Sequence, residues 1–266
     1  MNLPDEVKEI LDALLAGLRR ELGDRLVGVY LRGSLATGDF LPETSDVDLL
    51  AVTEQAIGDA EFDALARLHA QIAALPNRYA NRIEMAYVDR AALRRFQPGL
   101  RHATLGQGAS LEWAEHHANW ILERWTLRER GVVLHGPNPA TLVEPVTNAE
   151  LTEAVRSRLN DWAEWAETQD EPEWRAPRRS AAAYVVETMC RALYTLARKE
   201  LSSKARAVEW ALETLEEPWR STVERSRAWR TDATTDAGVV PEVVRLVIWA
   251  ASRANARAAW DCSMPK

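Results

Sequence analysis

The sequence predicts an α+β protein, in which a small mixed-sheet domain is followed by an all-helical bundle domain. Two observations predict this division. Short apolar segments of strand type alternate with helical segments up to residue 108, and long helical patterns follow. The composition changes at the same place, because all 11 Trp residues lie at or beyond Trp113. We therefore assign the domains to residues 1–108 and 109–266.

The N-terminal domain is expected to begin with an amphipathic helix, because apolar residues recur at helical spacing from Val7 to Leu22. A buried strand should follow, and Gly33 ends it before a short helical turn. The later elements show the alternation of strands or the spacing of helices. In order, the predicted elements are a strand at 26–31, a strand at 46–52, a helix at 59–75 and a strand at 82–88.

The C-terminal domain is expected to consist of helices joined by loops, some of which contain proline. Six helical segments with apolar residues at helical spacing support this expectation, and an all-helical bundle is the natural arrangement for them. The segments are 111–131, 148–168, 180–200, 204–215, 218–229 and 241–259.

The overall composition excludes several classes of function. A formal net charge of −7 argues against broad binding to nucleic acid, which needs a basic face. No apolar run approaches the length of a membrane span, and the acidic, amphipathic N-terminus does not look like a signal peptide. Cys190 and Cys262 make no disulfide framework. We expect a cytoplasmic monomer that acts on a small molecule.

Two carboxylates stand at the start of the second predicted strand. Asp46 and Asp48 are separated by one residue, so on a strand they point to the same side. Like charges this close repel each other unless a cation lies between them. An Asp-x-Asp pair alone arises often by chance, and its context must decide whether it binds a metal.

The context favours a nucleotidyl-transfer site. Glu84 lies on the third predicted strand, on the face opposite that strand's apolar residues, and would join the aspartates if the two strands pair. Carboxylate oxygens suit Mg²⁺, which usually shares its shell with substrate phosphates. Gly33 permits close approach of the backbone, and Ser34 opens a helix whose N–H groups and hydroxyl can hold a phosphate oxygen.

The pattern of Gly33-Ser34, the segment 45–48 and Glu84 resembles the polymerase-β-type nucleotidyltransferases. More narrowly, it resembles the bacterial aminoglycoside adenylyltransferases that modify streptomycin and spectinomycin. That family pairs such a domain with a helical C-terminal domain. In the second half of the chain the resemblance rests on the segment 190–215.

The resemblance implies roles for residues of both domains. Asp46 and Asp48 would hold Mg²⁺, and Glu84 would act as general base on the drug hydroxyl. The other implied roles are contacts to ATP or to the drug. Gly33, Ser34, Ser45, Arg191 and Lys204 would contact the triphosphate, Trp229 would stack on adenine, and Trp113 would belong to the drug pocket.

The chain departs from the family near the expected drug pocket. Ala181 stands where the family has an acidic residue, and Tyr184 where it has histidine or asparagine. Other acidic and aromatic side chains of this region could serve a cationic drug instead. They are Asp170, Glu171, Glu173, Trp162, Trp165 and Trp174.

Simpler interpretations stand beside these roles. Lys204 could be a solvated lysine at a helix end, and Arg191 could pair with Glu187 one turn earlier in its helix. Most Trp residues fit packing within a bundle. Adjacent His116 and His117 make a poor zinc chelate on a helix, because their side chains point about 100° apart.

The predicted function is Mg²⁺-dependent transfer of AMP from ATP to a hydroxyl of an aminoglycoside-type antibiotic, streptomycin or spectinomycin or both, which would confer resistance. ATP is expected to bind first, between the two domains. One alternative is a nucleotidyltransferase that modifies a protein or tRNA. Another is a nucleotide-binding module without catalysis, against which the complete set of Asp46, Asp48 and Glu84 argues.

Overall fold

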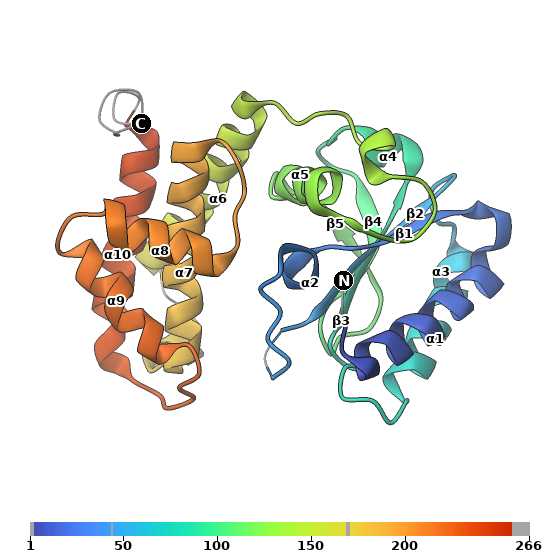
Figure 1. Cartoon of the computed structure of the whole chain (residues 1–266), viewed down its shortest axis with the longest axis horizontal. Coiled ribbons are helices and arrows are strands. Elements are labelled where there is room, and N and C mark those ends of the chain that lie inside the picture. The colour runs from blue at the N-terminus through green and yellow to red at the C-terminus, as the bar shows by residue number, and fades with distance from the viewer. Residues whose placement is uncertain (1–2, 44, 169–170, 257–266) are drawn as a thin grey trace. The chain divides into compact units, whose positions relative to one another are not determined.

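The computed structural model describes residues 3–43, 45–168 and 171–256. The chain forms two compact units, Met1–Val146 and Thr147–Lys266 (Figure 1). The first unit carries a mixed sheet and the second is helical, which confirms the predicted α+β fold class. The first unit ends at Val146, whereas the sequence predicted a domain boundary between residues 108 and 109.

A six-stranded sheet forms the centre of the N-terminal unit, with the strand order β5-β4-β3-β2-β1-β6. Its strands are β1 (Leu26–Leu31), β2 (Val47–Thr53), β3 (Ile83–Asp89), β4 (Arg101–Leu105), β5 (Glu112–Glu115) and β6 (Val132–His135). In the described part of the chain, β2 and β3 pair in parallel and the other neighbouring strands pair antiparallel. The three strands predicted in this unit are therefore confirmed to within one residue at each end.

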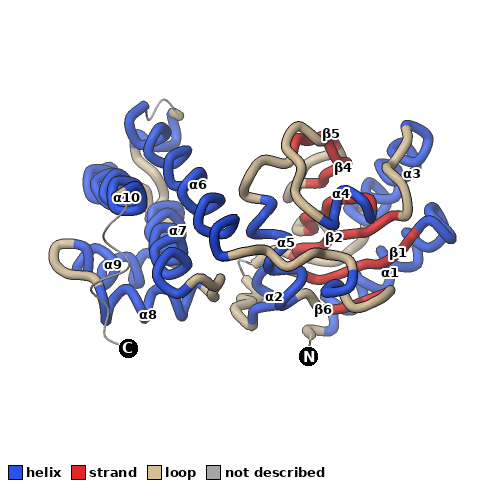
Figure 2. The backbone as a smooth tube through the Cα atoms, turned by 90° about the horizontal axis from the view of Figure 1, so that it is seen from above, coloured by secondary structure: helices blue, strands red, loops and turns tan. Residues whose placement is uncertain are grey.

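Helices cover the two faces of this sheet (Figures 1 and 2). On one face, α1 (Asp5–Leu22) and α3 (Asp59–Ala73) pack on strand residues such as Leu49 and Met85. On the other, α4 (Arg90–Arg94) and α5 (Trp120–Arg130) pack on their strand neighbours Leu50 and Ala86. Successive strand residues thus belong to two separate cores, as the alternation of side chains in a strand requires.

The helix predicted over 111–131 is wrong in its first half. Glu112–Glu115 form β5, which pairs with β4 in a hairpin, and the helix α5 begins only at Trp120. Gly106 and Gly108 lie in the turn of this hairpin, and Gly108 has a φ of +64°. Pairing with β4 therefore overrides a helical spacing of apolar residues. Because β5, α5 and β6 complete the N-terminal unit, the predicted domain boundary came too early.

The C-terminal unit contains α-helices that agree with the predicted segments. They are α6 (Asn148–Thr168), α7 (Arg179–Arg198), α8 (Lys204–Thr214), α9 (Trp219–Trp229) and α10 (Val240–Asn255). α7 contacts each of the other four and is buried along most of its length. Residues 257–259, which were expected to extend the last helix, lie outside the described residues, as does Cys262. None of the described helices has the length and apolarity that crossing a bilayer requires.

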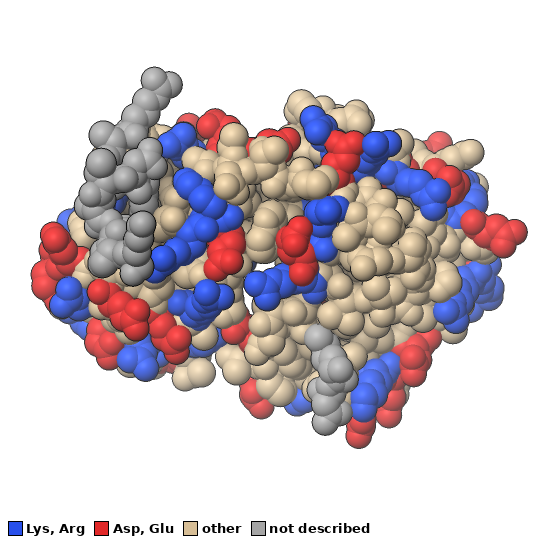
Figure 3. Space-filling model, turned by 45° about the horizontal axis from the view of Figure 1, so that its top comes forward, with Lys and Arg blue, Asp and Glu red and all other residues tan. Residues whose placement is uncertain are grey.

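Charged side chains of both signs lie among one another on the face of the molecule in Figure 3. Over the whole sequence the acidic residues outnumber the basic ones, which gives a formal net charge of −7.

Candidate active site

The pairing of β2 with β3 brings two of the predicted catalytic carboxylates together. Asp48 and Glu84 are direct partners in this parallel pair, so their side chains leave the sheet on the same face. Asp46 directly precedes β2, and its Oδ1 lies 3.8 Å from Nε of Arg82. The short apolar strands that were visible in the sequence are thus what places these acids side by side.

Gly33 lies against the Asp48 carboxylate. Its φ of +59° is in the left-handed region, which favours glycine. A Cβ built on Gly33 would overlap the carboxylate and lie 2.5 Å from Cγ of Asp48. The backbone of α2 (Gly33–Thr37) can therefore approach the acidic residues this closely only without a side chain at this position.

Arg32 is a residue of the site that the sequence analysis missed. Its Nη1 lies 2.7 Å from Oε2 of Glu123 and 3.9 Å from Oδ1 of Asp48. Its Nε donates a hydrogen bond of 3.3 Å to the carbonyl of Leu49, and the guanidinium lies 5.7 Å from the ring centroid of Trp120. With a side chain only 11 % exposed, Arg32 is a fixed positive charge beside the predicted metal ligand.

Burial and the neighbouring carboxylates both affect the pKa of Glu84. Its pKa is raised by burial and by the neighbouring Asp48, with further contributions from Asp46 and Glu123, while Arg32 opposes the shift. For Arg32, burial lowers the pKa, but Glu123 and Asp48 outweigh burial and raise it. The site therefore has an excess of negative charge that Arg32 only partly offsets.

The donor set fits a magnesium ion that is shared with phosphate. The described residues contain no group of three acidic, His or Cys side chains arranged to hold a metal by themselves. Mg²⁺, however, is commonly held by one or two carboxylates together with water and substrate phosphates. Asp46 and Asp48 can supply such carboxylates. The pKa of Glu84 is raised first by burial and then by repulsion from Asp48, and a bound cation would relieve the repulsion.

Both predicted serines precede the acidic residues in the chain, and Ser45 stands directly before Asp46. The carbonyl of Ser34 accepts hydrogen bonds from the backbone N–H groups of Gly38 and Asp39, both 3.0 Å long, which close the end of α2. The hydroxyl of Ser45 accepts from the backbone N–H of Leu41 at 2.9 Å. Ser45 therefore shapes the loop that leads to β2, and its contact with a phosphate stays a prediction.

Trp113 is not brought to the carboxylates. In the sheet it aligns with Ala103, Tyr87 and Ala51, which lie on the face opposite Asp48 and Glu84. Its ring stacks on Phe62 of α3 with centroids 5.1 Å apart. The drug contact of Trp113 was implied by the resemblance alone, whereas the strand turns this side chain toward Phe62 of α3.

In the C-terminal unit, one buried carboxylate forms ion pairs with two basic side chains. Glu187 of α7 is 7 % exposed. Its Oε2 lies 3.8 Å from Nζ of Lys204 and its Oε1 lies 3.2 Å from Nε of Arg230. The ammonium of Lys204 also lies 4.7 Å from the ring centroid of Tyr184. Lys204, whose side chain is 33 % exposed, thus has a buried carboxylate as an ion-pair partner. The contact of Arg230 with the same carboxylate was not predicted from the sequence.

The other two predicted ATP contacts in this unit are buried or partly buried. Trp229 is 7 % exposed, and this placement does not support its predicted stacking on adenine. Nε of Arg191 is buried and has no hydrogen-bond partner among the described residues. The ion pairs of Glu187 join it to Lys204 and Arg230, so the simple helical pairing of Arg191 with Glu187 is not what the structure has.

An aromatic cluster lies at the end of α6. The ring of Trp165 makes edge-to-face contacts with Trp162 and Trp174, at centroid distances of 5.3 and 4.6 Å. Nε1 of Trp165 donates a hydrogen bond of 2.9 Å to the carboxylate of Glu171. Glu171, one of the acidic residues considered for a cationic drug, is thus a hydrogen-bond partner of Trp165. Asp170 lies outside the described residues.

Comparisons with known proteins agree with this division of the chain. Residues 11–93 match the family model of the nucleotidyltransferase domain, and residues 141–250 match that of the aminoglycoside adenylyltransferase C-terminal domain. Aminoglycoside (3'') (9) adenylyltransferases of Shigella flexneri and Escherichia coli are each 25 % identical over 232 residues, with 84 % of both chains covered. The corresponding protein of Klebsiella pneumoniae is 24 % identical over the same length and coverage.

A solved structure shares the fold. The spectinomycin adenyltransferase AAD(9) from Enterococcus faecialis, crystallised with ATP and spectinomycin, superimposes with a TM-score of 0.72 at 15 % identity. The match covers 92 % of this chain and 99 % of that one. The chain is thus a nucleotidyltransferase, built like the aminoglycoside adenylyltransferases from a nucleotidyltransferase domain and the C-terminal domain of that family.

Proposed function

We propose that this enzyme transfers AMP from ATP to a hydroxyl group of streptomycin, of spectinomycin or of a related aminoglycoside or aminocyclitol, and so confers resistance. The observation that carries the proposal is the direct pairing of Asp48 with Glu84 on one face of the sheet, with Gly33 packed against Asp48. The relatives named as aminoglycoside adenylyltransferases, which match along most of the chain, support the choice of acceptor.

Asp46 and Asp48 would hold the magnesium ion of the reaction. Bound there, the ion would neutralise the charge of the phosphate oxygens during transfer. Arg32 lies 3.9 Å from Asp48 and adds a fixed positive charge at the same place. We propose that Arg32, held by Glu123, helps to keep the acidic residues ionised before the nucleotide arrives.

Glu84 would act as the general base. In this proposal it takes the proton of the drug hydroxyl, the oxygen forms a bond to the α-phosphorus of ATP, and pyrophosphate leaves. The raised pKa of Glu84 makes its carboxylate a stronger base than an ordinary glutamate. Burial thus favours the uptake of a proton by Glu84. The same surroundings make its ionised form unfavourable, because other carboxylates lie close to it.

The remaining predicted contacts would position the nucleotide. Ser34 and Ser45 would bind the triphosphate beside the carboxylates, and Lys204 would bind it with the help of Arg191. The anchoring of Lys204 by Glu187 supports a fixed position for its charge. For Trp229, burial argues against the stacking role, so the adenine contact is the least supported part of the proposal.

The test is to identify the product. The purified chain is incubated with ATP and Mg²⁺ and with either streptomycin or spectinomycin, and the drug is analysed by mass spectrometry for the addition of AMP. The matched variants are Asp48→Asn and Asp63→Asn, the second being an exposed aspartate of α3. We expect the adduct with the wild type and Asp63→Asn but not with Asp48→Asn. AMP found on protein or tRNA, with no drug adduct, would instead support the protein- or tRNA-modifying alternative.

A further inference from the structure

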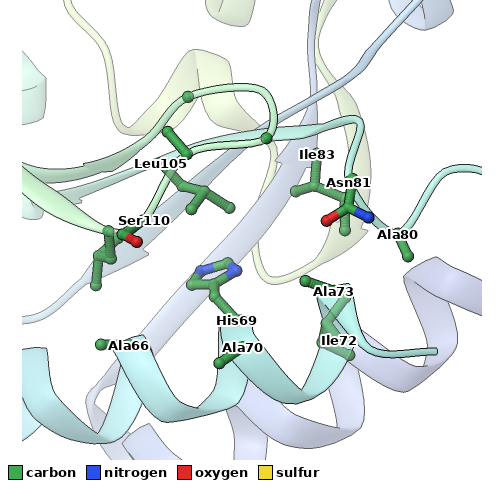
Figure 4. Close-up of a pocket in the computed structure, with 14 residues that line it drawn as sticks. Ala66, His69, Ala70, Ile72, Ala73, Ala80, Asn81, Ile83, Leu105 and Ser110 are labelled. Atoms are coloured by element: carbon green, nitrogen blue, oxygen red, sulfur yellow. The ribbon is translucent and has the colours of Figure 1, made fainter.

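The cavity beside α3 in the N-terminal unit offers no positive charge to a phosphate group. It has a volume of about 310 Å³ and is formed by α3, the segment before β3 and the loop between β4 and β5 (Figure 4). The described residues that line it include no Lys or Arg. Burial lowers the pKa of its histidine, His69, to about 4, so this ring is uncharged at neutral pH. Basic side chains gather instead in the C-terminal unit.

Two basic side chains of the C-terminal unit share one buried carboxylate. Glu187 of α7 is 7 % exposed. Its Oε1 lies 3.2 Å from Nε of Arg230, and its Oε2 lies 3.8 Å from Nζ of Lys204. A single carboxylate carries one negative charge and cannot neutralise both basic groups. The side chains of Lys204 and Arg230 are 33 % and 36 % exposed, so both can also contact a ligand from the solvent.

The backbone on both sides of Arg230 is fixed. Arg230 directly follows α9, whose last residue, Trp229, is buried. Two positions later, the carbonyl of Asp232 accepts a hydrogen bond of 2.9 Å from the backbone N–H of Ser180, and its carboxylate lies 3.2 Å from Nη1 of Arg179. Both of these partners belong to the first turn of α7. This anchoring limits the positions that the guanidinium of Arg230 can occupy.

Arg191 adds a third positive charge on the same side of α7. It lies four residues after Glu187, so the two side chains leave the helix on one face. Glu187 is the one acidic residue in the sequence of α7. The basic groups of Arg191, Lys204 and Arg230 therefore outnumber the carboxylate that lies among them.

A chain of phosphate groups is the ligand that suits this arrangement. Its negative charges lie on neighbouring groups, and several fixed cations can contact them together. Guanidinium groups match phosphate geometry especially well, because they present several N–H donors in one plane. Glu187 contacts Arg230 at Nε, and the Nη groups of the same guanidinium can donate to phosphate oxygens.

We propose that Arg230 is a third phosphate-binding residue of the C-terminal unit, beside Lys204 and Arg191, and that Glu187 positions Arg230 and Lys204 for the triphosphate of ATP. The inference rests on the proposed function, in which this unit contacts the nucleotide. Arg230 binds phosphate oxygens directly, whereas Glu187 acts through the two basic side chains that it holds.

Inorganic tripolyphosphate is the probe, because it carries the phosphate chain without adenosine. It is titrated by calorimetry into the full-length chain in the presence of a metal chelator. Without Mg²⁺ the carboxylates of β2 and β3 repel an anion, so binding reports on the basic groups. The matched variants are Arg230→Gln and Arg227→Gln, since Arg227 of α9 is 59 % exposed and pairs with Glu224. We expect about tenfold weaker binding in Arg230→Gln, as for one partly exposed hydrogen bond to a charged group, and little change in Arg227→Gln.

The variant Glu187→Gln separates direct binding from a balance of charge. If Arg230 only neutralised Glu187, Arg230→Gln would weaken binding in the wild type but not in the Glu187→Gln background. Direct binding predicts a loss in both backgrounds. Removing the negative charge of Glu187 would by itself tighten the binding of an anion. Loss of its positioning contacts predicts weaker binding instead.

Circular dichroism verifies that each variant is folded, and the double variant leaves no buried carboxylate without its partner. The inference is overturned if the wild type does not bind tripolyphosphate, if Arg230→Gln binds it as well as Arg227→Gln does, or if the loss vanishes in the Glu187→Gln background. Tighter binding by Glu187→Gln would overturn its positioning role. The mass-spectrometric assay of the drug adduct decides independently on the proposed function, which stands if the wild type forms the adduct whatever Arg230 contributes.

Discussion

Replacing Gly33 by alanine tests whether the first residue of α2 must lie against the carboxylate of Asp48, which is proposed to bind the metal. The φ of +59° at this residue is strained for alanine, and the new Cβ would lie 2.5 Å from Cγ of Asp48. Either the α2 segment or the carboxylate has to move. Both changes would disturb the arrangement that is proposed to bind Mg²⁺ and phosphate.

The magnitude can be separated into two terms. The left-handed conformation costs an alanine about 1–2 kcal/mol. Forced displacement of packed groups typically costs about 1–3 kcal/mol more. Gly38, at the other end of α2, has a φ of +83° and nothing within 4 Å of a built Cβ, so Gly38→Ala should show the first term alone. Gly33→Ala should therefore lose about 2–5 kcal/mol of unfolding free energy in total.

The assay is urea denaturation of both variants together with calorimetry of ATP binding in the presence of Mg²⁺. We expect Gly38→Ala to retain ATP binding and Gly33→Ala to lose most of it, although Gly33→Ala remains folded without denaturant. Equal stability losses in the two variants, combined with unchanged ATP binding in Gly33→Ala, would refute the reasoning about the close approach to Asp48.

Four further outcomes follow from the same geometry. Asp48→Asn should remain folded, as judged by circular dichroism, but lose Mg²⁺-dependent ATP binding; unchanged binding would remove Asp48 from the metal site. Because the pKa of Glu84 is raised in the folded state, its ionised form destabilises the protein above that pKa. Glu84→Gln should therefore be more stable than the wild type at neutral pH, and this advantage should vanish as the pH falls through the raised pKa; a variant no more stable at any pH would contradict the shift. Arg32→Met should lower the unfolding free energy by about 2–4 kcal/mol, because it leaves the carboxylates of Glu123 and Asp48 without their shared cation; a loss below that of a typical surface substitution in urea denaturation would argue against the role of Arg32. Glu187→Ala should destabilise the chain more than Lys204→Ala, since it leaves two cations without their buried partner; equal losses in the same assay would contradict this.

The parts of the site that could be predicted from the sequence depend on local patterns. Asp48 and Glu84 each stand at the start of a short apolar strand, and strand alternation places both on one face of the sheet once the two strands pair. Gly33 could be recognised because glycine is favoured where a backbone must turn and approach another group closely. The pairing of the two strands was a single further assumption, and the structure confirms it.

The parts that could not be predicted depend on contacts between distant segments. Arg32 meets Glu123 across 91 positions of sequence, and only the packing of α5 on the sheet brings them together. An arginine directly before the Gly-Ser pair was the one available signal. For Trp113, the helical spacing of its neighbours predicted a helix, whereas pairing with β4 made a strand and turned the ring to the opposite face.

The central claim is that the carboxylates of β2 and β3 carry out AMP transfer, with Glu84 as the base. The most direct measurement is the rate of AMP transfer to the accepted drug by Glu84→Gln at saturating ATP and Mg²⁺, together with its ATP affinity. The account predicts that affinity is retained while the rate falls by about 10²–10⁴-fold, the usual contribution of a general base. An unchanged rate would contradict the claim, and a collapse of ATP affinity would show that Glu84 serves chiefly as a metal ligand.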